Sequence, residues 1–378
     1  MTERPLHGLR VLELARILAG PWIGQVLADL GAEVVKVEAP AGDDTRRWGP
    51  PFVDATGSAA YFHAANRGKR SVACDFADPE DLALVKRLAG EADVVIENFK
   101  VGGLARFGLD AASLRAAHPG LIYCSVTGFG QTGPHASRAG YDFLIQGMSG
   151  LMSVTGAPDG EPQKVGVAVT DLATGLYGVI AIQAALLRRA RTGEGAHLDL
   201  ALLDCATALM ANQAASALAT GVAPRRLGNA HPAIVPYQVF ESRGGPLIVA
   251  VGNDAQFARF CELIGLPDLP SDPRFADNPG RVENREALVP MLAEAVARAD
   301  RADLLAAMEA RTVPGGPIHD LTEALADPQV AARGLAIAPG GVAALGTPIV
   351  MDGAGTASDR PAPRLDEHGE EIRRAGWG

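Results

Sequence analysis

The sequence predicts an α/β protein whose larger part is a doubly wound parallel sheet with helices on both faces. Strand-like and helix-like segments alternate along the first 200 residues. Most of the strand-like segments are rich in β-branched and apolar residues, as is typical of strands buried on both faces of a parallel sheet. Glycine and proline stand where helices should end and begin. Together these features indicate consecutive βαβ units.

The first such unit occupies the first 40 residues. Residues 10–14 (RVLEL) read as a strand, and Pro21 suits the first turn of a helix that runs to about Leu30. Gly31 fits the C-terminal cap of this helix, and residues 33–38 (EVVKVE) read as the next strand. The pattern then recurs, with strands predicted at 71–76, 93–99 and 121–126 and a helix at 78–91 capped near Asp78.

One acid stands alone in the stretch VGVAVTDLATGLYG (165–178). Asp171 is surrounded by small and apolar residues, and burying a carboxylate without partners costs several kcal/mol or forces its protonation. The following residues have helical spacing, with arginines before Gly193, so a helix is expected to begin at Asp171 or one residue either side. Asp171 is therefore either a helix cap or a functional acid, and the positive end of the helix dipole would favour its ionised form.

The chain is expected to divide into a large domain and a smaller one. Residues 197–204 begin as a strand and lead into a further helix, after which the sequence becomes rich in glycine, proline and arginine near residues 220–230. We therefore assign 1–220 to the large α/β domain and 221–325 to a small α+β domain, with 326–378 as a C-terminal segment.

Composition excludes several classes of function. The 378 residues are 48% hydrophobic and 21% charged, with a formal net charge of −10 and no dense run of lysine and arginine, which argues against nucleic acid or an anionic membrane as partner. No secretory signal and no membrane span is predicted. The four cysteines are widely spaced, so we expect reduced, buried thiols in a cytoplasmic protein and no metal site.

The first βα turn argues against a dinucleotide. Glu38 lies where an NAD-binding acid would sit, but the turn reads LARILAGPW and lacks the GxGxxG glycines that let backbone approach a pyrophosphate. Basic residues in the N-terminal half follow several predicted strands, where open α/β sheets bind ligands. Singly they read as surface charges. Together they could hold a multiply phosphorylated ligand; they are Arg46, Arg47, Arg67, Lys69, Arg70, Arg106 and Arg138.

Several segments together resemble one enzyme family. They include PLHGLRVLEL, LADLGAEVVKVEAPAGDDTR, NRGKRSVACD, VVIENFKVGGLARFGL, GFGQTGP, AGYD and VAVTDLATG. In these segments the chain resembles the class III CoA-transferases, from about Leu6 to His368. The resemblance implies a Rossmann-like large domain completed by the C-terminal segment 326–378, a smaller domain, and an interlocked homodimer. It also implies CoA or an acyl-CoA as substrate and no tightly bound cofactor.

The resemblance assigns roles to individual residues. Asp171 corresponds to the catalytic nucleophile of the family. The positions that match CoA contacts are Leu18, Ala19, Cys74, Asn98, Phe99, Arg106, Arg138 and Tyr141. Two positions differ from the formyl-CoA transferases: Leu18 replaces a glutamine and Ala39 replaces an arginine, so a formyl or oxalate specificity is not expected.

The sequence offers two alternatives to a transferase, a racemase of the same fold and a CoA-binding regulatory protein. The α-methylacyl-CoA racemases share the fold but have a histidine where this chain has Tyr141, and an unactivated tyrosine with a reference pKa of about 10 is a poor base near neutrality. A CoA-binding regulatory protein that has lost its chemistry would not need the intact Asp171 segment. A transferase needs only the carboxylate, which would pass through an aspartyl anhydride and an aspartyl-CoA thioester.

The acyl group is expected to be a short dicarboxylate. Residues 148–177 and 228–240 resemble the subgroup that moves CoA between acids such as succinate and glutarate, with succinyl-CoA as donor. The distal carboxylate would suit an arginine, because the planar guanidinium binds a carboxylate through two hydrogen bonds. The candidates are Arg46, Arg47 and Arg226.

Overall fold

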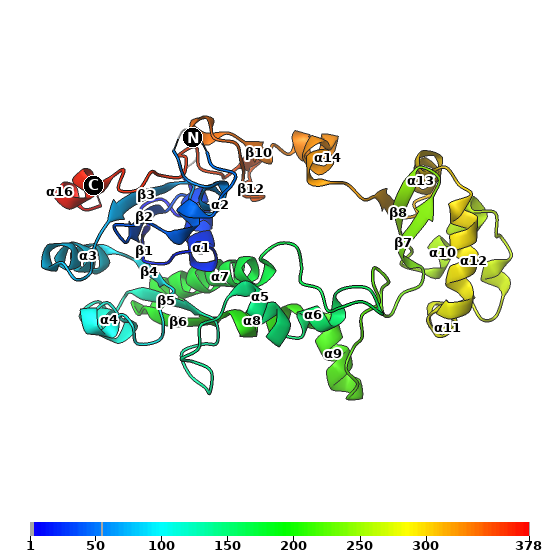
Figure 1. Ribbon diagram of the computed structural model, residues 1–378, viewed down its shortest axis with the longest axis horizontal. Coiled ribbons are helices and arrows are strands. Elements are labelled where there is room, and N and C mark those ends of the chain that lie inside the picture. The colour runs from blue at the N-terminus through cyan, green and yellow to red at the C-terminus, as the bar shows by residue number, and fades with distance from the viewer. Residues whose placement is uncertain (1–3, 54–55, 378) are drawn as a thin grey trace. The chain divides into compact units, whose positions relative to one another are not determined.

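The computed structural model describes residues 4–53 and 56–377, and the chain folds as two units (Figure 1). The first comprises Met1–Leu151, Lys164–Gly221 and Asp327–Gly378, and the second comprises Met152–Gln163 and Val222–Ala326. The segment Met152–Gln163 thus belongs to the second unit, although the sequence placed it within the large domain 1–220. No local sequence pattern predicts this assignment, because the unit to which a segment belongs depends on its contacts with residues far away in the sequence.

The first unit is built on a six-stranded parallel sheet of order β3-β2-β1-β4-β5-β6. The strand order reverses between β1 and β4, which lie side by side at the centre, as in other doubly wound folds. The strands are β1 (Arg10–Glu13), β2 (Glu33–Glu38), β3 (Lys69–Ala73), β4 (Val94–Glu97), β5 (Ile122–Thr127) and β6 (Ala196–Ala201). This confirms the predicted fold class for the larger part of the chain.

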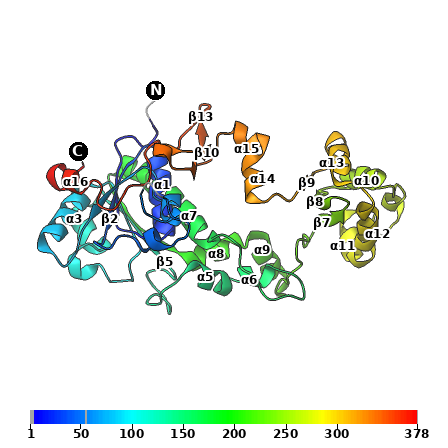
Figure 2. The same ribbon diagram turned by 45° about the horizontal axis from the view of Figure 1, so that its top comes forward.

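Helices connect these strands and cover both faces of the sheet (Figures 1 and 2). The helices of the first unit up to residue 221, with α6 at its border with the second, are α1 (Ala19–Asp29), α2 (Ala60–Ala64), α3 (Pro79–Glu91), α4 (Ala111–Ala117), α5 (Asp142–Met148), α6 (Leu151–Val154), α7 (Val169–Thr192), α8 (Leu202–Leu209) and α9 (Ala211–Thr220). The C-terminal segment adds α15 (Pro328–Ala332), α16 (Gly369–Ala375) and two short hairpins, β10 (Ala336–Ile337) with β11 (Ala344–Leu345) and β12 (Val350–Met351) with β13 (Ala354–Gly355).

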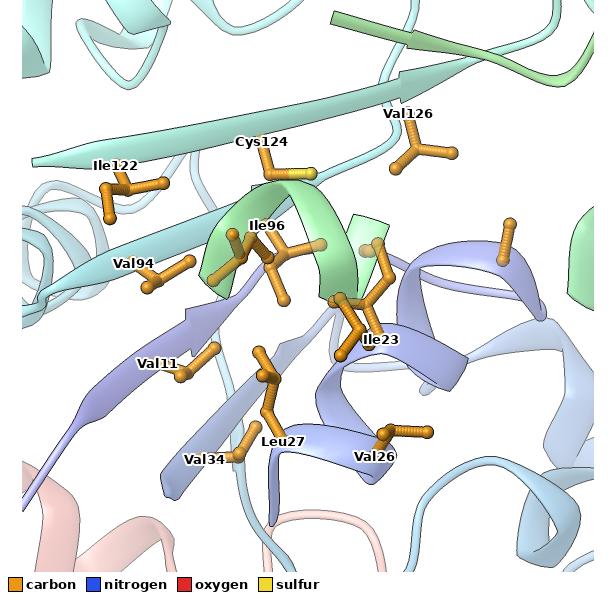
Figure 3. Packing of buried hydrophobic residues seen from close by; sticks show 14 of the residues in the cluster. Val11, Ile23, Val26, Leu27, Val34, Val94, Ile96, Ile122, Cys124 and Val126 are labelled. Atoms are coloured by element: carbon orange, nitrogen blue, oxygen red, sulfur yellow. The ribbon is translucent and has the colours of Figure 1, made fainter. Parts of the chain in front are cut away.

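Alternate residues of β1, β2, β4 and β5 enter opposite cores. On one face, Val11, Ile96 and Cys124 pack against Ile23 and Leu27 of α1, as Figure 3 shows, and α7 lies against the same cluster. On the other face, the neighbouring strand residues pack against α3, α4 and α16. This burial on both faces explains why these four strands lack the polar alternation that the edge strand β6 (AHLDLA) shows.

The C-terminal segment packs against the β3 edge of the sheet. The amide of His368 donates to the carbonyl of Ser71 at 3.0 Å, and Arg70 donates to the carbonyl of Trp377 at 2.8 Å. The buried Trp377 in turn donates its indole N–H to the carbonyl of Leu88 in α3 at 3.1 Å. In both views α16 lies beside α3 and β3 (Figures 1 and 2).

The second unit contains a three-stranded antiparallel sheet of order β7-β8-β9 and its own helices. Its core includes Phe257, Phe260 and Phe275, and the buried Arg281 donates to the carbonyls of Val235 and Phe275. Its elements are β7 (Tyr237–Ser242), β8 (Gly245–Ala250), β9 (Gly315–Pro317), α10 (Asp254–Leu263), α11 (Asn278–Glu283), α12 (Arg285–Ala297), α13 (Arg301–Ala310) and α14 (Leu321–Ala326).

Two elements begin earlier than the sequence predicted. Strand β3 begins at Lys69 rather than at residue 71, because Lys69 and Arg70 are buried in ion pairs instead of marking a charged loop. Helix α7 begins at Val169, two residues before Asp171.

Helix α7 also bears on the prediction that no segment spans a membrane. Among the described residues it is the one helix long and apolar enough to do so, by length and composition alone. A core helix of a soluble protein passes the same test, and Val179 and Ile182 of α7 are buried in the core on the α1 side of the sheet.

Candidate functional site

A cavity of about 560 Å³ opens at the carboxyl ends of the parallel strands. It lies where the strand order reverses between β1 and β4, the place at which open α/β sheets bind ligands, and its size is typical of a small-molecule site. Of the residues assigned to CoA contact and catalysis, all but Cys74 line it, namely Leu18, Ala19, Asn98, Phe99, Arg106, Arg138, Tyr141 and Asp171.

Cys74 lines a second cavity of about 290 Å³. The two cavities share Phe99 and Arg106 as walls, so they are neighbours along the same edge of the sheet. Burial raises the pKa of the Cys74 thiol to about 12, so the thiol stays neutral and contributes packing rather than reactivity.

Asp171 is not the cap of α7. It is the third residue of the helix, and the residue at the cap position, Ala168, offers no side-chain acceptor. The cap comes from Asp142 at the start of α5, whose carboxylate accepts from the amide of Thr170 at 2.9 Å and from its hydroxyl at 2.6 Å. A carboxylate in this position bonds an otherwise unpaired N–H and meets the positive end of the helix dipole. Asp171 is therefore not needed to cap the helix.

The carboxyl group of Asp171 changes its protonation state near neutral pH. Its side chain is partly buried and, among the described residues, makes no hydrogen bond. Burial, reinforced by the nearby charge of Asp142, raises the pKa of Asp171 from its ordinary 3.8 to about 7. The sequence predicted that the helix dipole would keep this acid ionised; burial and the second carboxylate outweigh the dipole.

The segment that precedes α7 is tied to α5. Gln146 donates to Asp142 at 2.8 Å and accepts from the amide of Val165 at 2.8 Å. The loop leading into α5 passes very close to the end of β5: a Cβ on Gly128 would lie 2.5 Å from the Cα of Gly140, so both positions require glycine. These contacts fix Tyr141 and Asp142 beside the cavity.

Asn98 holds the protein backbone rather than pointing freely at a ligand. Its side-chain amide donates to the carbonyl of Arg16 at 2.7 Å, and its oxygen accepts from the amide of Arg16 at 3.0 Å. Asn98 still lines the cavity, but its side chain secures the first βα turn, on which Leu18 and Ala19 sit.

Two guanidinium groups on the cavity have no carboxylate partner among the described residues. Arg106 lies over the ring of Phe107 at 4.5 Å, and Arg138 lies over that of Phe129 at 5.0 Å. Both side chains are exposed. In a chain with a net charge of −10, two unpaired cations on one cavity favour an anionic ligand.

The three arginines predicted for a substrate carboxylate differ in availability. Arg46 is buried and binds Glu38 through two hydrogen bonds of 2.8 and 2.7 Å, with further bonds to Ser58 and Pro363, so it has no free face for a substrate. The prediction that Arg46 binds a substrate carboxylate is therefore wrong. Glu38, which lies where an NAD-binding acid would sit, instead binds Arg46. The exposed Arg47 pairs with Asp44 at 3.2 Å. In the second unit Arg226 donates to the carbonyls at 157 and 160.

Two residues near Asp171, Asp142 and Tyr61, escaped the sequence interpretation. Asp142 belongs to the AGYD segment, but nothing in the sequence linked it to the start of α7. Burial and the charges of Asp171 and Asp142 raise the pKa of Tyr61 in α2, which shows that Tyr61 lies near these acids. Its ring makes an edge contact with the half-exposed Trp48 at 5.3 Å between ring centres. Nothing in the sequence AYFHA of this five-residue helix links Tyr61 to the start of α7.

The raised pKa makes Asp171 a source of instability at alkaline pH. The unfolded chain holds this acid near pKa 3.8 and the folded chain near 7, so the folded state loses stability as the pH rises from about 4 to 7, and the loss is fully present at pH 8. We expect Asp171→Asn to stabilise the protein at pH 8 by about 2 kcal/mol, after allowance for partial exposure, and the gain to disappear as the pH falls from 7 to 4. Urea denaturation at several pH values measures this.

The matched control is Asp204→Asn, which removes an exposed acid from the first turn of α8. It should cost a few tenths of a kcal/mol at pH 8, because it loses only a favourable contact with the helix dipole. Equal effects of the two substitutions at pH 8 would contradict the assigned pKa.

Comparison with known proteins places the chain in a family. A succinate–glutarate CoA-transferase of Agrobacterium fabrum is 54% identical, with 97% of this chain and 94% of that protein covered. A succinyl-CoA:glutarate CoA-transferase of Mus musculus is 42% identical, with 98% and 86% covered. The crystal structure of a CAIB/BAIF family protein from Brucella suis has 57% identity and a TM-score of 0.90, with both chains fully covered. The model of CoA-transferase family III matches residues 6–369, and the chain belongs to this family.

Proposed function

We propose that the protein transfers CoA from succinyl-CoA to glutarate or a similar short dicarboxylate, with Asp171 as the nucleophile. The observation that carries the proposal is the carboxylate of Asp171 on the wall of a cavity that also holds two guanidinium groups without a carboxylate partner among the described residues, in a chain of CoA-transferase family III. The dicarboxylate is proposed from two relatives: the Agrobacterium protein is a succinate–glutarate CoA-transferase, and the mouse protein is a succinyl-CoA:glutarate CoA-transferase.

The chemistry needs one carboxylate. An oxygen of ionised Asp171 attacks the thioester carbon of succinyl-CoA, the C–S bond breaks, and CoA leaves as a thiolate. The thiolate then attacks the aspartyl carbon of the mixed anhydride, which releases succinate and leaves an aspartyl-CoA thioester. A glutarate oxygen attacks that thioester and expels the thiolate, which attacks the glutaryl carbon. The products are glutaryl-CoA and free Asp171, and every step conserves an activated acyl bond.

The substrate would lie along the edge of the sheet. Arg106 and Arg138 suit the phosphate groups of CoA, because guanidinium groups bind phosphate oxygens through charge-assisted hydrogen bonds. The neighbouring cavity that contains Cys74 would accept another part of the CoA moiety, since Arg106 and Phe99 are common to both cavities. No tightly bound cofactor is needed for any of these steps.

The distal carboxylate of the dicarboxylate is assigned to Arg47. This residue is exposed and directly precedes Trp48, whose ring contacts Tyr61 near Asp171. Its partner Asp44 is also bound by Arg16 at 2.8 Å, so Asp44 stays paired when Arg47 turns to a substrate. The role of Arg226 stays a prediction from the sequence.

We also propose a homodimer in the cytoplasm. Helix α7 presents an apolar face in the first unit, on which Leu176, Ile180 and Leu187 are each more than half exposed. Such a face on a long helix is typical of one covered by another chain, and a second copy of this chain fits the interlocked dimer expected from the resemblance. The four free, buried cysteines agree with a reducing compartment.

The covalent mechanism predicts that exchange depends on Asp171. Mixing the protein with succinyl-CoA and a panel of free acids should give new acyl-CoA, with glutarate preferred over monocarboxylates. Asp171→Asn should lower the rate by at least about a thousandfold, because no other described group is placed to form the anhydride. Mass spectrometry should find a hydroxylamine-sensitive adduct on the peptide that contains Asp171 in the parent protein. An exchange rate for Asp171→Asn equal to that of the parent would refute the proposal.

The pH dependence follows from the raised pKa of Asp171. Only the carboxylate attacks, so kcat/KM should rise tenfold per pH unit below about 6 and level off above about 8, around the pKa of about 7. Asp142→Asn removes the nearby negative charge and should move the midpoint to lower pH by roughly half a unit to one unit. Asp199→Asn, which removes a carboxylate elsewhere in the unit, should leave the midpoint in place. A profile that is flat between pH 5 and 9 contradicts the assignment.

The dicarboxylate assignment predicts a selective effect on the acceptor. Arg47→Gln should raise KM for glutarate by roughly tenfold or more, since a charge-assisted hydrogen bond is lost, while KM for a monocarboxylate such as butyrate changes little. Arg274→Gln, which alters an exposed arginine paired with Asp272 in the second unit, serves as the control. Equal changes for both acids would assign the distal carboxylate to another residue.

A further inference from the structure

Six charged side chains are buried together beneath the first βα turn. Three are acids and three are bases, so the cluster is neutral. They are Glu13, Lys36, Glu38, Asp43, Arg46 and Lys69, each less than one tenth exposed. Burying so many charges carries a large desolvation cost, which hydrogen bonds must offset. None of them takes part in the mechanism proposed above, which raises the question of what the cluster holds in place.

The cluster reaches the backbone of the turn at three points. Lys36 donates to the carbonyl of Ala15 at 2.8 Å, and Lys69 donates to that of Pro21 at 2.8 Å. Between them, the amide of Ile17 donates to both carboxylate oxygens of Asp43, at 3.2 and 3.3 Å. Asp43 is itself held by Lys36, with 3.0 Å between the ammonium nitrogen and a carboxylate oxygen.

The backbone needs this support because Ile17 has an unfavourable conformation. Its φ is +73°, in the left-handed region, which a β-branched residue rarely adopts. Such a conformation persists only when the surrounding structure enforces it. Arg16, the preceding residue, is held at its amide and carbonyl by Asn98. Asp43 is the group that holds Ile17 itself.

The strained turn leads directly into the cavity wall. Ile17, Leu18 and Ala19 line the same cavity as Asp171. Leu18 also has an irregular backbone, with φ −136° and ψ −58°, and no side chain caps the start of α1 at this residue. If Ile17 relaxed to a negative φ, the chain direction would change at this point and Leu18 and Ala19 would shift along the wall.

We propose that Asp43 is a positioning residue for CoA transfer: through its bonds to Ile17 and Lys36 it holds the first βα turn so that Leu18 and Ala19 keep the acyl group in line with Asp171. This inference rests on the proposed function. Asp43 touches neither substrate nor Asp171. A displacement of about 1 Å in such a wall lowers a rate by as much as a hundredfold, because the reacting atoms lose their near-attack geometry.

The test combines two substitutions. Asp43→Asn keeps one acceptor oxygen but places an amide group where Lys36 and Ile17 now meet a carboxylate oxygen. We expect kcat to fall by roughly 10- to 100-fold while KM for succinyl-CoA changes by less than about threefold, since the turn is displaced but Arg106 and Arg138, the arginines proposed for CoA, make no contact with Asp43. Adding Ile17→Gly should restore kcat to within about fivefold of that of the Ile17→Gly single variant, because glycine adopts a positive φ without the carboxylate.

The control is Ser71→Ala in the same network. Ser71 donates to Glu38 at 2.7 Å but does not touch the turn, so its loss weakens the cluster without moving Ile17. It should leave kcat unchanged. A general loss of stability would lower kcat for Ser71→Ala as well and would not be reversed by Ile17→Gly, and either result would overturn the proposal.

A second measurement separates this inference from the proposed function. Hydrogen exchange of a peptide spanning residues 15–20 should speed up at least about tenfold in Asp43→Asn and stay unchanged in Ser71→Ala, whatever reaction the protein catalyses. Unchanged hydrogen exchange in Asp43→Asn would refute the role of Asp43 in holding the turn. If Asp43→Asn does speed up hydrogen exchange but the parent protein transfers no CoA, the proposed function is refuted instead.

Discussion

The two hydrogen bonds from Thr170 to the carboxylate of Asp142 are the contact on which the rest of the site depends. They cap α7 from a different element, so the helix begins at Val169 and Asp171 falls inside its first turn. If Asp171 had capped the helix, its own carboxylate would have been occupied by the backbone N–H groups of the first turn. Because α5 supplies the capping acid, Asp171 keeps both oxygens free of hydrogen bonds to the described residues.

The same arrangement sets the protonation of Asp171. Burial raises the pKa of Asp171 most, and the negative charge of Asp142 adds to it, so the pKa rises to about 7. Near neutrality a substantial fraction of the acid is charged, and the charged form is poorly stabilised by its surroundings. For the proposed nucleophilic role, an acid in this state would react faster than one held by several hydrogen bonds, and the cost would appear as lost stability rather than as lost reactivity.

The sequence predicted what local patterns determine. Apolar strands alternating with helices predicted the parallel sheet, and the isolated acid in VAVTDLATG indicated Asp171 as a candidate functional residue. Long-range contacts account for the failures. The start of α7 depends on Asp142, about 28 residues earlier. Lys69 and Arg70 read as surface charges because their partners, the buried Glu13 and the partly buried Glu33, lie in other elements. Arg46 looked available for a substrate because a sequence does not show that Glu38 binds it.

The first βα turn illustrates how one fold serves different ligands. In a dinucleotide site, glycines at this turn supply the positive φ and let the pyrophosphate approach the backbone. Here Ile17 has a positive φ without being glycine, and Asp43 and Asn98 hold the turn through bonds to Ile17 and Arg16. Because tertiary contacts replace the conformational freedom of glycine, the turn can carry the apolar side chains of Ile17 and Leu18 on the cavity wall. In the proposed mechanism, an apolar wall would limit the access of water to the anhydride and thioester at Asp171, so that hydrolysis would compete less with transfer. The order of the strands thus decides where the cavity lies, and the residues of this turn decide which chemistry it suits.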